Sequence, residues 1–236
     1  MSSIHNNPML MFTISVSIFG MLIVLMLAFN PPLINEKFFW RKPFVGSLFS
    51  LICILGIFAA LFPKQCSKTF HFQRSEMNFT SHQISATSKG HHPDCGEFSA
   101  HVIQVGGYTI CAACTGLLLG AIIAFIATAF FFFDELRIGE MSFPAVMIGV
   151  IGLVLGFFQL KFRGIIRSML NLFFVFGAFL ILIGIDELVK SLIVDLFLTV
   201  LIVFWLLTRI RLSQWDHMRI CINCKNPCEV RESKKG

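Results

Sequence analysis

Six of the eight cysteines fall into two groups whose spacing is typical of metal ligands. The first group has the order Cys-x5-His-x9-Cys-x2-Cys. A Cys-x2-Cys pair can place two thiolates on one ion, and a more distant Cys and His can complete a tetrahedron. The pattern predicts a structural zinc site whose candidate ligands are Cys95, His101, Cys111 and Cys114, with His91 and His92 as further ligands or as hydrogen-bond donors to a ligand.

The second group lies near the C-terminus and has the order His-x3-Cys-x2-Cys-x3-Cys. Its residues are His217, Cys221, Cys224 and Cys228. This group can hold a second ion, or its three thiolates can share one site with members of the first group. Both arrangements stay open on the sequence alone.

Zinc is favoured over the other chemistries of clustered thiols. Disulfides are disfavoured in a reducing compartment, where metal ligation is the better use of clustered cysteines. An iron–sulfur cluster is a weaker prediction, because the tail order reverses the Cys-x3-Cys-x2-Cys order of radical enzymes. The remaining alternative is a redox-active pair formed by Cys111 and Cys114, at the start of an apolar stretch.

The elements that must position these residues belong to a membrane protein. Hydrophobic residues make up 56% of the 236 residues and charged residues 14%, against about 45–50% and about 25% in soluble chains. The mean hydropathy is +0.79, and 28 residues are phenylalanine. A soluble domain of this size has too little interior for so much apolar surface. Lipid must therefore cover the remainder.

The apolar residues divide into stretches long enough to cross a bilayer, which takes about 17–25 residues each. We predict an all-α integral membrane protein with an N-terminal helix pair in residues 1–62, an inside Cys/His loop at 63–114, four helices in 115–208 and a basic Cys-rich tail at 209–236. The six predicted spans are 9–29, 44–62, 115–133, 142–160, 167–185 and 192–208. No Gly or Pro marks a turn between the last two, so one long broken helix is the alternative there.

Smaller elements are predicted around these spans. Residues 102–105 and 108–110 can form a short β-hairpin around Gly106-Gly107. The loop 63–114 and the tail 209–236 are of about the size at which small segments need a metal to fold. Two Gly-x3-Gly pairs, Gly116/Gly120 and Gly152/Gly156, place small residues on one helix face, and we expect them to serve packing within the chain.

Charge distribution predicts the orientation. Fourteen of the 19 Lys and Arg residues fall in or beside segments 1–8, 63–114, 161–166 and 209–236, and the other five fall in the alternate loops. The positive-inside rule therefore predicts a multi-pass protein of the cell membrane with both termini cytoplasmic. The net charge of +6 is then a topology signal. We expect the lipid bilayer, other membrane subunits and no nucleic acid as partners.

Few charged residues lie near the apolar spans. Asp186, Glu187, Lys190 and Asp195 cluster around the boundary between the fifth and sixth spans. Intramembrane charge often marks a transport path. We interpret these four residues instead as lying at the outer membrane interface, because the spans themselves are almost purely apolar.

One part of the chain resembles a known family. It is similar to an uncharacterised family of small predicted membrane proteins of bacteria and archaea, in an archaeal-type variant. The similar residues are His91-His92-Pro93-x-Cys95-x2-Phe98-x2-His101, followed by Cys111-Ala112-Ala113-Cys114-Thr115-Gly116 and Gly120. The resemblance implies that Cys95, Cys111 and Cys114 match the family's thiols, and that the Cys-x-x-Cys-x-Gly-x3-Gly element opens a transmembrane helix. Ala113 and Gly96 replace an Arg and a His of the bacterial pattern. The family brings no known activity.

Two functions follow from these features. The first is a non-enzymatic membrane protein whose cytoplasmic zinc site supports a role as scaffold or accessory subunit. The alternative is a membrane thiol–disulfide oxidoreductase in which Cys111 and Cys114 exchange electrons with a quinone. The sequence favours a non-enzyme, because no phosphate-binding Gly loop, Ser–His–Asp set or paired-carboxylate motif stands out.

Overall fold

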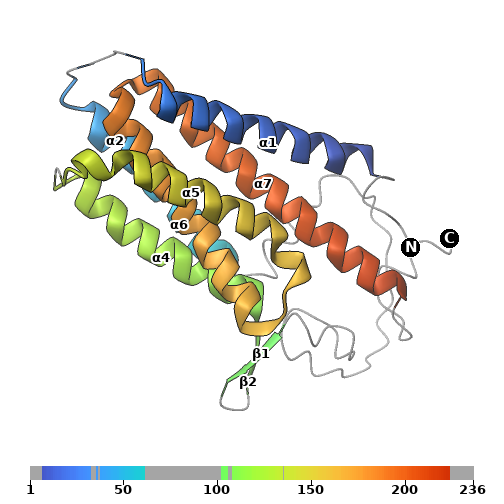
Figure 1. Cartoon of the computed structure of the whole chain (residues 1–236). Helices are drawn as coiled ribbons and strands as arrows, with labels where there is room; N and C mark the ends of the chain where they lie inside the picture. The colour runs from blue at the N-terminus through green and yellow to red at the C-terminus, as the bar shows by residue number, and fades with distance from the viewer. Residues whose placement is uncertain are drawn as a thin grey trace, which may run out of the picture.

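The part of the chain that the structure describes is built from long helices. The computed structural model describes residues 7–32, 36, 38–61, 102–105, 108–134 and 136–223. The long helices of this part are arranged roughly side by side (Figure 1). They are α1 (Pro8–Phe29), α2 (Arg41–Leu61), α4 (Ala112–Phe132), α5 (Ser142–Phe157), α6 (Gly164–Val189) and α7 (Leu192–Asn223).

Six helical segments of the described part are long and apolar enough to cross a membrane. One of them is α5 together with the flanking 3-10 turns η3 (Gly139–Met141) and η4 (Phe158–Lys161). Each segment overlaps one of the stretches predicted from the sequence. The prediction of an all-α protein with six membrane-spanning helices is therefore confirmed at the level of helix length and composition.

The fifth and sixth spans are two separate helices. Helix α6 ends at Val189 and α7 begins at Leu192. Lys190 between them adopts a left-handed conformation with φ of 50°, and its amide donates to the carbonyl of Asp186. This conformation stops a helix without Gly or Pro, and α7 then runs in the opposite direction to α6 (Figure 1). The single broken helix is excluded.

Helix α7 continues well past residue 208, where the sequence predicted the tail to begin. Charged residues suggested that the chain leaves the bilayer there, yet Arg209 and Asp216 are buried. Leu212 and Trp215 form a small apolar cluster with Leu10 of α1. Packing against α1 and burial of the charges therefore support the helix from residue 208 to Asp216.

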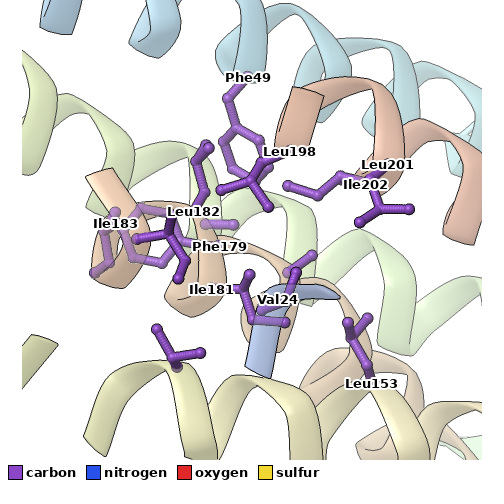
Figure 2. Close-up of a cluster of buried hydrophobic side chains, with 14 of the residues drawn as sticks. Val24, Phe49, Leu153, Phe179, Ile181, Leu182, Ile183, Leu198, Leu201 and Ile202 are labelled. Carbon is purple, nitrogen blue, oxygen red and sulfur yellow. The ribbon is translucent and has the colours of Figure 1, made fainter. Parts of the chain in front are cut away.

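Helix α6 is the centre of the bundle. In its most apolar stretch 72% of the residues are buried, compared with 22% to 44% in the other five segments. Figure 2 shows part of the apolar core that surrounds it, to which side chains of all six long helices of the described part contribute. They include Val24 of α1, Phe49 of α2, Leu153 of α5, Phe179, Ile181, Leu182 and Ile183 of α6, and Leu198, Leu201 and Ile202 of α7.

Glycines let neighbouring helices approach α6 closely. A Cβ atom at Gly149 of α5 would lie 2.6 Å from the carbonyl oxygen of Gly177, and one at Gly152 would lie 2.7 Å from that of Phe173. A Cβ at Gly116 of α4 would collide with the carbonyl of Ser168. The predicted use of the Gly-x3-Gly pairs in packing within the chain is confirmed.

The outer surface of the bundle is apolar. Apolar side chains along α1 and α7 are more than half exposed, such as those of Phe12, Met26, Ile193 and Val200. Exposed apolar surface on this scale is not tolerated in water. The helices therefore contact the lipid bilayer through these faces.

Two short strands precede α4. Strands β1 (Val102–Val105) and β2 (Tyr108–Cys111) pair antiparallel, with Val102 opposite Cys111 and Val105 opposite Tyr108. Helix α4 begins at Ala112, directly after the last residue of β2. In Figure 1 the strands project from the end of the bundle at which α4 and α6 begin. This connection holds Cys111 at the junction of strand and helix.

Candidate functional site

Cys111 and Cys114 lie together at the start of α4. Cys111 is the residue that caps the helix and Cys114 lies in its first turn. Neither cysteine forms a disulfide, both are half-buried, and their side chains interact with each other. The hydroxyl of Thr115 donates to the carbonyl of Cys111 at 3.0 Å, which holds this turn. The partial positive charge of a helix N-terminus stabilises anions such as thiolates.

Two buried arginines lie beside the thiols. Arg167 near the start of α6 interacts electrostatically with Cys111, and Arg209 of α7 interacts with both cysteines. The guanidinium of Arg167 also forms an ion pair with Asp216, with 3.6 Å between Nη2 and Oδ2. The thiol pair therefore has buried positive charge on the side of α6 and α7.

Arg209 is held by neutral groups. Its Nε donates to Oδ1 of Asn171 at 2.9 Å, its Nη2 donates to the same oxygen, and Nη2 also lies 3.4 Å from Oε1 of Gln159. Asn171 in turn donates to the carbonyl of Arg167 at 2.7 Å. In the part of the chain that the structure describes, no carboxylate forms an ion pair with Arg209. Cys111 and Cys114 are ionisable groups whose negative form would offset the charge of Arg209.

Most of the other predicted zinc ligands fall outside the described residues. The predicted ligands outside the described residues are His91, His92, Cys95, His101, Cys224 and Cys228. His217 and Cys221 lie on the last turns of α7, but their side chains are not described. Among the described residues, no group of three or more His, Cys, Asp or Glu side chains is arranged to hold a metal. The structure brings together Cys111 and Cys114 from the predicted set.

A second polar cluster lies at the opposite end of the bundle, where α2 and α7 begin and α6 ends. Asp186 and Asp195 are completely buried, and both accept hydrogen bonds from the guanidinium of Arg41. Asp186 and Asp195 lie at helix ends, and they are enclosed by protein. Their predicted place at the outer membrane interface stays a prediction. They are internal because Arg41, the first residue of α2, folds inward to pair with them.

Sequence reasoning missed this cluster. The two carboxylates lie nine positions apart on either side of a turn, and their partner is 145 positions away from Asp186. One signal was available. Asp195 falls in the first turn of an apolar helix, and a charge so placed usually faces a partner within the bundle.

The fold and these clusters define a polytopic membrane protein with a buried polar cluster at each end. No family model, curated protein or solved structure matches this chain. The resemblance of residues 91–120 to the uncharacterised membrane family stays a prediction.

Proposed function

We propose that this chain is a multi-pass protein of the cell membrane that binds zinc at the start of α4. Cys111 and Cys114 supply two thiolates, and Cys95 and His101 complete the tetrahedron. The zinc is structural, and the protein serves as a scaffold or accessory subunit of a membrane complex.

The observation that carries this proposal is the contact between the Cys111 and Cys114 thiols beside the buried charge of Arg209. A buried guanidinium with neutral hydrogen-bond partners needs a counter-charge, because an uncompensated buried ion is costly. Thiolates supply that charge, and zinc binds thiolates rather than thiols. A zinc ion with three thiolates and one imidazole keeps a net negative charge, which suits the neighbouring arginine.

The C-terminal end of α7 is compatible with a contribution from the second cysteine group. Asp216 pairs with Arg167, and Arg167 also interacts with Cys111. His217 follows Asp216 directly in the chain. Helix α7 therefore ends near the Cys111 side of the bundle, and His217, Cys221, Cys224 and Cys228 are proposed as ligands of the same or a second ion.

Metal analysis of the full chain tests the proposal. We expect the protein purified in detergent without added metal to contain stoichiometric zinc, and a Cys111→Ser/Cys114→Ser variant to lose it. A chelator should lower the melting temperature of the wild type and leave that of the double variant unchanged. Structural zinc contributes folding free energy directly, about 10 kcal/mol or more in small metal-dependent domains.

Cys53→Ser is the matched control, because Cys53 is buried in the apolar core away from the thiol pair. This variant should retain full zinc content. Wild-type protein that is free of metal and indifferent to chelators would contradict the proposal.

Arg209→Gln tests the electrostatic part of the argument. The substitution removes the buried positive charge but keeps a hydrogen-bonding side chain. We expect the zinc affinity, measured by competition with a chromophoric chelator, to fall by about 10–100-fold, as for other groups that support metal ligands. Arg211→Gln on the exposed side of the same helix should leave the affinity unchanged. Equal affinities for the two variants would show that Arg209 does not act on the site.

The second candidate function is a thiol–disulfide oxidoreductase, which the contact between two half-buried cysteines that form no disulfide favours. In this reaction Cys111 and Cys114 form a disulfide and transfer two electrons and two protons to a quinone, which becomes a quinol. Incubation of the metal-free protein with a quinone, followed by thiol counting, tests it. Stoichiometric loss of both thiols with formation of quinol supports this function over zinc binding, whereas a chelator-sensitive zinc content supports the first proposal.

A further inference from the structure

Two carboxyl groups share one guanidinium at the end of the bundle opposite the thiols. Asp186 lies in the last turn of α6 and Asp195 in the first turn of α7. Nη1 of Arg41 donates to Oδ1 of Asp186 at 2.6 Å and to Oδ2 of Asp195. The side chains of both aspartates are 0% exposed and that of Arg41 is 5% exposed. The three groups are thus removed from water.

Each carboxyl keeps one oxygen without a hydrogen-bond donor. In the described part of the chain, Oδ2 of Asp186 and Oδ1 of Asp195 are buried and accept no hydrogen bond. Because both carboxyl groups accept from the same Nη1 atom, they meet at one point in the bundle, where they could share a hydrogen bond if one oxygen carried a hydrogen. Two ionised carboxylates cannot do so, because neither has a hydrogen to donate. A proton on either one supplies the missing donor.

Among the residues that the structure describes, the charges in contact with the pair leave one negative charge in excess. Lys42 of α2 is the second cation, with its Nζ 3.8 Å from Oδ2 of Asp186 and 3.4 Å from Oε2 of Glu187. The same Nζ lies 4.6 Å above the ring of Phe131 of α4. Three carboxylates, those of Asp186, Glu187 and Asp195, therefore face two cations.

The other charged residues described near the pair, Glu36 and Lys190, do not correct this imbalance. Glu36 accepts hydrogen bonds from Oγ of Ser191 at 3.0 Å and from the amide of Leu192 at 2.8 Å. It caps the N-terminus of α7, whose partial positive charge balances it. Lys190 lies in the connection between α6 and α7 and is half-exposed, so water screens its charge.

We propose that Asp186 and Asp195 form a proton-binding site in which the two carboxyl groups share one proton beneath Arg41. The shared proton satisfies the orphaned oxygens and brings the net charge of the cluster to zero. A metal cation would compete with Arg41 for the same oxygens, whereas a proton fits between them. Release of the proton would leave an uncompensated charge where α2, α6 and α7 meet, so protonation at this site is coupled to the packing of these helices.

Infrared difference spectroscopy of the full chain in lipid vesicles tests this proposal. The C=O stretch of a protonated carboxyl group is separate from the bands of ionised carboxylates and shifts in D2O. At neutral pH, where exposed aspartates and glutamates are ionised, we expect one such band per chain. Asp186→Asn and Asp195→Asn should each abolish it. Glu187→Gln is the matched control, and its band should equal that of the wild type.

The absence of a protonated carboxyl band at neutral pH in the wild type would overturn the proposal, as would a band that survives in both Asn variants. A band that responds to replacement of sodium by choline, but not to pH, would show a metal-cation site instead. If an Asn variant does not fold, isotopic labelling of the aspartate carboxyls in the wild type replaces it. The band must then shift with the label and persist in Asp216→Asn, and failure of either result rejects the assignment to this pair.

Discussion

Replacement of Arg41 by alanine should destabilise the protein by about 3–5 kcal/mol, the usual cost of removing one partner from a buried ion pair. The guanidinium of Arg41 bridges Asp186 and Asp195, and all three side chains are buried. Without it, both carboxyl groups remain inside the bundle with Lys42 as the nearest cation. We expect this loss in the free energy of unfolding measured in mixed detergent micelles.

Arg137→Ala is the matched control for this prediction. Arg137 lies in the exposed connection between α4 and η3, where substitutions usually change stability by less than about 0.5 kcal/mol. A triple variant, Arg41→Met with Asp186→Asn and Asp195→Asn, should recover much of the lost stability, because it removes the stranded charges together. The electrostatic explanation fails if Arg41→Ala and Arg137→Ala have the same effect.

Replacement of Gly177 by alanine should also destabilise the protein clearly. A Cβ atom at this position would lie 2.6 Å from the carbonyl oxygen of Gly149 and 3.3 Å from Cα of Gly152. All of these atoms are backbone, so no flexible side chain can move aside. Helix α5 must shift away from α6, and overpacking of this kind costs about 1–3 kcal/mol. The loss is measurable as a lower melting temperature in detergent.

Gly56→Ala provides the comparison. The Cβ of this variant would meet only the Cβ of Ala121, at 3.9 Å, which is ordinary van der Waals contact. Alanine is a better helix former than glycine by about 1 kcal/mol, so Gly56→Ala should be neutral or stabilising. If Gly177→Ala is equally harmless, the close approach of α5 to α6 is not required for stability.

The features that follow from local sequence could be predicted. Each membrane span is a continuous apolar stretch, and a bilayer selects helices there because backbone groups must be paired within the segment. The proximity of Cys111 and Cys114 also follows locally, because residues three apart at a helix start lie on one face. The boundary at Lys190 was less visible, because the left-handed turn that ends α6 uses a lysine in place of glycine.

The C-terminal end of α7 could not be predicted from the local sequence. Arg209 and Asp216 carry charges that normally mark the end of a membrane span. Their partners Asn171, Gln159 and Arg167 belong to α6 and to the segment between α5 and α6. A charge is tolerated inside the bundle when such partners are present, and one segment of sequence does not contain that information.

By itself, the sequence determined that the described part of this membrane protein holds six membrane-spanning helices and that two of its cysteines lie side by side at the start of α4. These properties depend on composition and on contacts within one turn of chain. Only the tertiary structure decided which polar residues are internal. Arg41 meets Asp186 and Asp195 across 145 and 154 positions of sequence, and Arg209 reaches Asn171 across 38. Such contacts arise when helices pack, because burial forces each charge to find a partner that no local pattern specifies.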